Sequence, residues 1–221
     1  MRLTPLLMGV VVAAGCSSTS SGRAVVWVTR DRGAHVLHVA KVPAGLTAIQ
    51  GLERVAKVET RYGGRYVRAV DGVRERGQTA WFYYVNGYLA DRSAAEYRLH
   101  AGDVEWWDYR SWRDPAQDPV VVGAFPEPFL HGYGGKRRRT VIVAAQPDRV
   151  RALARRLHAR VAVHVRSRDV NVISVGHGAR TTAELTFTGS TAPGSPVRLS
   201  FTGDPEVLLR RWPFRFRYSM R

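Results

Sequence analysis

The first half of the chain is organised around the segment Trp81-Phe82-Tyr83-Tyr84-Val85-Asn86-Gly87. Aromatic and β-branched residues are enriched in strands, so Thr79 to Val85 is predicted to be a strand. Asn-Gly supplies the two positive φ angles that a two-residue hairpin turn needs. The stretch therefore predicts a strand that enters a tight β-hairpin.

Upstream of this strand, the sequence predicts another hairpin and one helix. Residues 24–29 and 36–40 are β-prone and are separated by a turn that contains Gly33. The stretch Thr47-Ala48-Ile49-Gln50 has the spacing of a capping box, and apolar residues follow it with helical periodicity. We therefore expect a helix from about Ala48 to about Val58.

Further strands complete the first unit. A strand from Tyr66 to Val70 is predicted to end in the tight turn Asp71-Gly72. A second strand pair is predicted from Glu96 to His100 and from Val104 to Arg110. Residues 24–111 are thus expected to form a small β-rich sheet domain with one helix.

The second unit follows a polar, proline-punctuated linker at residues 112–119. A helix is predicted to open at Pro147-Asp148, because proline is favoured in the first turn of a helix, and a shorter one is predicted to be capped by Asp204-Pro205. Strands are predicted at residues 120–124, 140–144, 161–165, 170–175, 183–188, 197–201 and 214–218. The predicted fold class is α+β, with a second α+β domain at residues 120–221.

The first 16 residues indicate export. An apolar stretch from Leu6 to Gly15 follows a basic start and is too short to span a bilayer, which is typical of a signal peptide. Small residues precede Cys16, so residues 12–16 resemble the lipobox of bacterial lipoproteins. We expect residues 1–15 to be removed, Cys16 to be acylated and residues 16–23 to form a flexible tether. Membrane lipid is then a partner and the location is extracytoplasmic; an incidental free thiol is the alternative.

Four stretches of the first unit carry a resemblance to a known family. They are Pro43 to Glu53, Tyr66 to Val73, Trp81 to Gly87 and Glu96 to Asp103. Each alone is a common motif, but in this order and spacing they resemble the C-terminal β-rich domain of transcobalamin and intrinsic factor, and the domain of unknown function 4430 family. One departure is Ser93, where the family has glycine four residues before the tyrosine matched by Tyr97. The second unit resembles no family that we recognise.

The resemblance implies a corrinoid as one candidate ligand. In the vitamin carriers this domain closes over one face of the corrinoid, while an all-helical barrel holds the other face. No such barrel is encoded here, so a two-sided clamp cannot be assembled from this chain alone. Ligand binding would need a partner subunit, a transporter component or a different, smaller ligand.

Two aromatic groups in the first unit are candidate ligand platforms. Successive strand residues alternate between the two faces of a sheet, so adjacent rings point away from the core unless both faces are covered. An exposed ring could stack on a planar ligand or a sugar, whereas the alternatives are core filling and packing against the second unit. The candidate ligand-binding residues are Trp81, Tyr83, Tyr84, Asn86, Trp106 and Trp107.

The formal net charge of +16 is distributed unevenly. Residues 121–221 contain 18 Lys and Arg residues but only 6 Asp and Glu residues, whereas the first 120 residues are nearly balanced. Such an excess favours anionic lipid head groups or wall polymers as partners over nucleic acid. The basic run Lys136, Arg137, Arg138 and Arg139 is the candidate polyanion-binding site, with a solvated turn as the alternative.

Several classes of function find no support in the sequence. There is no Gly-x-Ser-x-Gly elbow, paired-carboxylate motif or phosphate loop, and the seven histidines lack metal-ligand spacing. We therefore expect that the protein is not an enzyme and that it binds no metal and no cofactor. Two hypotheses remain: a lipid-anchored protein that captures a small ligand such as a corrinoid for uptake, or an envelope interaction protein whose basic second domain binds a polyanion or a membrane partner.

Overall fold

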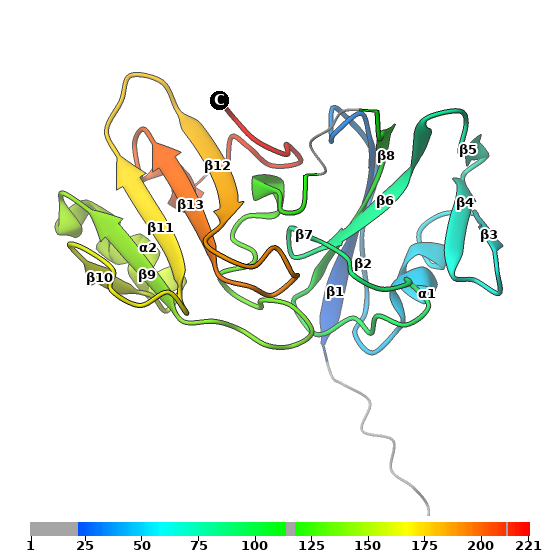
Figure 1. Ribbon diagram of the computed structural model, residues 1–221, viewed down its shortest axis with the longest axis horizontal. Coiled ribbons are helices and arrows are strands. Elements are labelled where there is room, and N and C mark those ends of the chain that lie inside the picture. The colour runs from blue at the N-terminus through cyan, green and yellow to red at the C-terminus, as the bar shows by residue number, and fades with distance from the viewer. Residues whose placement is uncertain (1–21, 114–117, 211) are drawn as a thin grey trace, which may run out of the picture.

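The computed structural model describes residues 22–113, 118–210 and 212–221. Within these ranges the chain forms two five-stranded sheets and one three-stranded sheet, with short helices (Figure 1). This arrangement is β-rich and agrees broadly with the predicted α+β class. The predicted signal peptide, Cys16 and most of the tether lie outside the described residues.

The first sheet is built around the aromatic strand β6 and its neighbour β8. The predicted hairpin forms β1 and β2, and β6 turns into β7 through Asn86 and Gly87, whose φ angles are 51° and 83°. Strands β1 and β8 run parallel, and the other pairs are antiparallel. In order across the sheet the strands are β2 (His35–Pro43), β1 (Arg23–Arg30), β8 (Val104–Ser111), β6 (Thr79–Val85) and β7 (Tyr88–Leu89).

The chain between β2 and β8 contains one helix and the small sheet. Helix α1 (Ala48–Glu53) begins with the predicted capping box of Thr47 and Gln50. It is shorter than predicted, because the Lys57 amide donates to the Asp71 carboxylate at 2.8 Å and the strand β3 (Val58–Arg61) begins at the next residue. The small sheet consists of β3 (Val58–Arg61), β4 (Tyr66–Val70) and β5 (Val73–Arg74).

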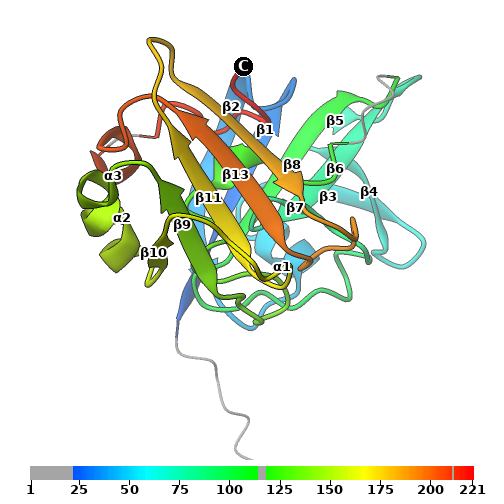
Figure 2. The same ribbon diagram turned by 60° about the vertical axis from the view of Figure 1, so that its left-hand side comes forward.

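The second sheet belongs to the C-terminal half. Helices α2 (Arg151–Arg156) and α3 (Val207–Arg210) lie on the same side of it (Figure 2), and η2 (Pro147–Val150) leads into α2. Strand β12 is antiparallel to β13, whereas the other pairs are parallel. In order the strands are β10 (Arg160–Ala162), β9 (Thr140–Ala144), β11 (Asn171–Gly176), β13 (Val197–Thr202) and β12 (Thr182–Phe187).

Three predicted strands are wrong. Residues 96–100 instead make separate backbone bonds that hold the start of α1, such as the Ala48 amide to the Tyr97 carbonyl at 2.9 Å. Residues 120–124 form the 3₁₀ helix η1 (Val122–Ala124). Residues 214–218 form turns, because this segment bonds to η1 through single contacts rather than to a strand ladder.

The two halves of the chain share one apolar core. Buried residues of the first sheet and of the second sheet belong to the same contiguous cluster. Residues 214–218 lie between the two five-stranded sheets (Figure 1). They pack against the first sheet, although they are far from its strands in the sequence. The predicted division into independent domains therefore stays a prediction, and residues 114–117 of the predicted linker lie outside the described part of the chain.

Candidate functional site

The aromatic residues of β6 and β8 are buried by the protein itself. Trp106 and Tyr84 are 0% exposed, Trp107 is 3% exposed and Trp81 is 6% exposed, while Tyr83 is half-buried. Both faces of the first sheet are covered at β6 and β8. The expectation of exposure is therefore wrong for the rings of Trp81, Tyr84, Trp106 and Trp107, whereas ligand binding by the half-buried Tyr83 stays a prediction.

One face of this sheet is covered by the end of the chain. The ring of Tyr218 meets those of Trp106 and Tyr84 edge-on, with centroids 5.3 Å away in both cases. Phe216 packs edge-on against Trp27 at 4.5 Å. Packing against the C-terminal half, one of the alternatives for Trp106, is the arrangement observed.

The opposite face is covered by local chain. The ring of Tyr83 stacks on that of Trp107 with centroids 4.9 Å apart, and the Tyr83 hydroxyl donates to the Arg92 carbonyl. Trp81 donates its indole N–H to the Val73 carbonyl at 2.9 Å. Because these polar atoms already have partners, the rings serve the core of the first unit.

A buried carboxyl is hydrogen-bonded to the Trp107 indole. Glu105 is 0% exposed, and its Oε1 accepts the Trp107 indole N–H at 2.5 Å. Its Oε2 has no hydrogen-bond partner among the described residues. Burial raises the pKa of the Glu105 carboxyl well above its usual range, despite the lowering effect of the Trp107 bond.

Asn86 is a structural residue of the turn rather than a surface ligand. Its side chain is 0% exposed, and its amide nitrogen donates to the Asp103 carboxylate and the Gly132 carbonyl, both at 2.7 Å. Its side-chain oxygen accepts the Val104 amide at 2.7 Å. Asn86 thus ties the β6–β7 hairpin to a loop of the C-terminal half, and its predicted exposure to a ligand is corrected.

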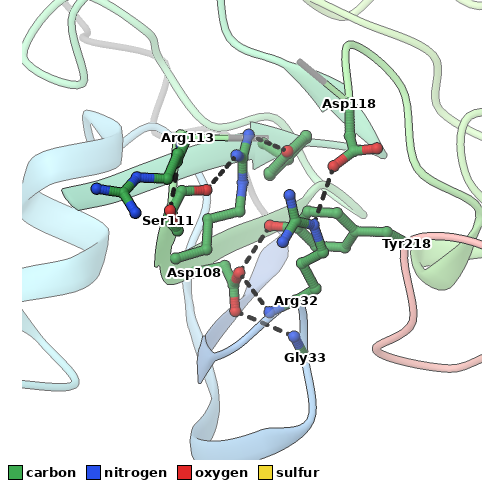
Figure 3. A network of polar contacts seen from close by, with 9 residues as sticks. Arg32, Gly33, Asp108, Ser111, Arg113, Asp118 and Tyr218 are labelled. Atoms are coloured by element: carbon green, nitrogen blue, oxygen red, sulfur yellow. Dashed lines mark hydrogen bonds and ion pairs between the residues drawn. The ribbon is translucent and has the colours of Figure 1, made fainter. Parts of the chain in front are cut away.

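A second buried carboxylate fastens the chain end to the first sheet (Figure 3). Asp108 is 0% exposed and accepts the Tyr218 hydroxyl at 2.8 Å. It also accepts the backbone amides of Arg32 at 3.0 Å and Gly33 at 3.1 Å, and the Thr29 hydroxyl. These four donors satisfy the carboxylate, so this network stabilises the fold and leaves no acceptor for a ligand.

The predicted polyanion-binding run is divided between two surfaces. Arg137 donates to the carbonyls of Phe129 and Leu157, at 3.0 and 2.6 Å, and Arg138 binds the Gly194 carbonyl and the Asp169 carboxylate. Lys136, Arg137 and Arg138 line one cavity of about 520 Å³, whereas Arg139 lines another. The run therefore does not form one continuous patch.

The second cavity lies at the beginnings of strands β9 and β10, and we name it the β9–β10 groove. It has a volume of about 550 Å³, and no Asp or Glu lines it. Within the described residues, the side chains of Arg139, Arg160 and Arg166 make no hydrogen bond or ion pair. The groove is lined by Arg139, Thr140, Val141, His158, Arg160, Ala162, His164, Val165, Arg166, Ser167 and Val170.

Every acidic residue of the C-terminal half is paired elsewhere. Each of these six carboxylates lies within ion-pair distance of an arginine or a histidine that does not line the β9–β10 groove. The pairs are Glu127 with His131, Asp148 with Arg151, Asp169 with Arg138, Glu184 with Arg221, Asp204 with Arg149 and Glu206 with Arg210. The positive charge of the groove is consequently not neutralised by this half of the chain.

Most residues of the groove were not singled out from the sequence, which pointed only to Arg139. A signal was present in residues 160–166, where valine occupies positions 161, 163 and 165, and three of the four other residues are Arg160, His164 and Arg166. In an extended chain this alternation places the valine side chains and the basic side chains on opposite faces. The strand predicted at residues 161–165 is observed only as β10 (Arg160–Ala162).

The described ranges lack a metal-ligand cluster and a membrane-spanning helix. They contain no group of three or more His, Cys, Asp and Glu residues placed to hold a metal ion. None of their helices has the length and apolar character needed to cross a membrane.

The comparisons with known proteins concern the first unit. Residues 45–111 match the family model described as Domain of unknown function (DUF4430), which confirms the resemblance seen in the sequence over that range. None of the curated proteins matches the chain.

Two solved structures are similar over part of the chain. Haptocorrin in complex with cobinamide is 16% identical, with a TM-score of 0.35 over 41% of this chain and 25% of the haptocorrin chain. A candidate metal-binding protein from Ruminococcus gnavus is 18% identical, with a TM-score of 0.33 over 41% of this chain and 97% of its own. The similarity to haptocorrin therefore spans a quarter of that protein.

Proposed function

We propose that this protein is an extracytoplasmic binding protein, rather than an enzyme, that is held at a membrane by a lipid on Cys16 and binds an anionic partner through its C-terminal half. The observation that carries the proposal is a groove that no described carboxylate lines, surrounded by three arginines whose side chains have no hydrogen bond or ion pair within the described part of the chain. All six carboxylates of this half are engaged elsewhere. An anion from outside the C-terminal half is the partner that this charge distribution favours.

The membrane attachment rests on the apolar stretch and small residues that precede Cys16. A single acyl chain binds a membrane only marginally, whereas several chains hold a protein effectively permanently. We expect the protein produced in a lipoprotein-processing bacterium to incorporate labelled palmitate and to sediment with membranes. A Cys16→Ser variant should do neither, and equal labelling of the two proteins would contradict the proposal.

The anionic partner can be tested by the salt dependence of binding. Interactions between exposed charges are screened with a Debye length of about 10 Å at 0.1 M salt and about 3 Å at 1 M salt. We expect the protein to bind long-chain polyphosphate, a soluble anionic polymer, at low salt and to release it at high salt. Absence of binding at low salt would refute an anionic partner.

A corrinoid is the second candidate ligand, because the first unit resembles the C-terminal domain of transcobalamin and intrinsic factor. Because the rings of Trp106 and Trp107 are buried, a corrinoid would contact another surface of this unit or be shared with a partner such as a transporter subunit. We expect titration with cobalamin and cobinamide to give saturable heat if this unit binds a corrinoid by itself. Absence of heat with both compounds would contradict corrinoid binding by this unit alone. Corrinoid binding shared with a partner would then require that a transporter subunit is retained by the protein only when cobalamin is present.

A further inference from the structure

We propose that the β9–β10 groove is a binding site for a phosphate ester that carries an apolar substituent. This inference rests on the proposed function, since it gives the anionic partner a chemical class and a place.

The charge of the groove comes from three separate segments. Arg139 precedes β9, Arg160 begins β10, and Arg166 lies in the chain that follows β10. Since β10 and β11 flank β9 and all three strands are parallel, residues 163–170 must return across β9 to reach the start of β11. The fold thus brings three exposed guanidinium groups around one cavity.

The carboxylate nearest in sequence does not neutralise this charge. Asp169 precedes the groove-lining Val170, but it is paired with Arg138, which lines the other cavity. Guanidinium groups bind carboxylates and phosphates through paired N–H donors. Three of them around one cavity suit a phosphate group, because its terminal oxygens can accept from several donors at once.

The rest of the lining indicates what the phosphate group is attached to. Val141, Ala162, Val165 and Val170 contribute apolar surface, and Ser167 and Thr140 contribute hydroxyl groups. The buried Thr140 hydroxyl has no hydrogen-bond partner among the described residues. A volume of about 550 Å³ exceeds what an inorganic anion needs and lies in the range of small-molecule sites. An ester with an apolar substituent matches both parts of this lining.

The turn before β10 presents a histidine at the groove. His158 has a φ of 45°, in the left-handed region where glycine is favoured at the end of a helix. The backbone at this position would therefore accept glycine, so a His158→Gly variant removes the imidazole while it keeps the turn. This variant separates a binding role of the side chain from a folding role.

The test is isothermal titration of the full chain with phenyl phosphate, inorganic phosphate and phenol. We expect phenyl phosphate to bind at least about tenfold more tightly than inorganic phosphate, and phenol to give no saturable heat. Arg160→Gln and Arg166→Gln should each weaken the binding of phenyl phosphate by about tenfold or more, the order expected for one charge-assisted contact. His158→Gly should weaken binding severalfold and leave the thermal unfolding midpoint unchanged or raised.

Arg180→Gln is the matched control, because Arg180 is exposed, belongs to the same half and does not line the groove. It should alter the affinity by less than about twofold. Wild-type affinity in Arg160→Gln and Arg166→Gln would overturn the groove as the site, and equal affinity for phenyl phosphate and inorganic phosphate would overturn the apolar part. If these variants still release polyphosphate in a salt-dependent manner, the proposed function stands without this site.

Discussion

The hydroxyl of Tyr218 is expected to stabilise the attachment of the chain end to the first sheet. It donates to the fully buried Asp108 carboxylate at 2.8 Å (Figure 3). Its ring packs against that of Trp106. Tyr218→Phe removes only this donor, because the ring is kept. The variant therefore measures the hydrogen bond separately from the aromatic packing.

The magnitude follows from the surroundings of Asp108. Hydrogen bonds to charged groups contribute about 1.5 to 3 kcal/mol. Since the carboxylate keeps its donors from Thr29, Arg32 and Gly33, it is not left unsatisfied, and we expect the free energy of unfolding to fall by about 2 kcal/mol. With a urea m-value of about 2 kcal/mol per molar, the midpoint should fall by about 1 M.

The assay is urea unfolding followed by tryptophan fluorescence, which reports on the buried Trp106 beside Tyr218. The matched control is Tyr62→Phe, because Tyr62 is 77% exposed and a surface substitution usually changes stability by less than about 0.5 kcal/mol. If the two variants unfold at the same urea concentration, the hydrogen bond from Tyr218 to Asp108 does not stabilise the attachment of the chain end, and the reasoning from this bond is refuted.

Three further predictions concern single residues. Asn86→Ala should lower the free energy of unfolding by more than about 2 kcal/mol in the same urea assay, because three buried hydrogen bonds are lost. Thr47→Ala should lower the free energy of unfolding, measured in the same way, by about 1 kcal/mol, because the helix cap is lost. Thr47→Ser keeps a capping hydroxyl and should retain most of the wild-type stability. The hydrogen bond to Glu127 raises the pKa of His131 above its ordinary value of 6.5. The contribution of this bond to the free energy of unfolding is therefore fully present below pH 6.5 and declines as the pH rises above it. Unfolding of His131→Gln, measured at several pH values, should lack this decline.

Local sequence rules predicted the elements that are held by local bonds. The capping box at Thr47, the turn at Asp71-Gly72 and the hairpin at Asn86-Gly87 all depend on residues a few positions apart. Strand β6 begins at Thr79 and ends at Val85, as predicted, for the same reason. These features and the DUF4430 resemblance define most of the first unit.

The strands that were predicted wrongly lie where distant parts of the chain are in contact. Residues 214–218 have the alternation of a strand, yet the Phe216 amide bonds to the Gly123 carbonyl and the Tyr218 carbonyl accepts the Val122 amide. No spacing rule connects these residues with η1. Residues 120–124 were misassigned for the same reason, because they make only one isolated bridge, from Val120 to Tyr88 of β7, and their other partners are Gly87 and the chain end.

The same long-range packing changes where binding should be sought. The sequence places adjacent aromatic residues in strands β6 and β8, and alternation alone would expose some of them. The chain end covers Trp106 and Tyr84 on one face, and Tyr83 stacks on Trp107 on the other, so the rings are used for the fold. What remains unpaired around a cavity is charge, at Arg139, Arg160 and Arg166. Because burial of apolar rings stabilises the fold, a ligand that stacks on Trp106 or Tyr84 would first have to displace residues 214–218. The guanidinium groups of the groove are already exposed, so the proposed anion requires no such rearrangement.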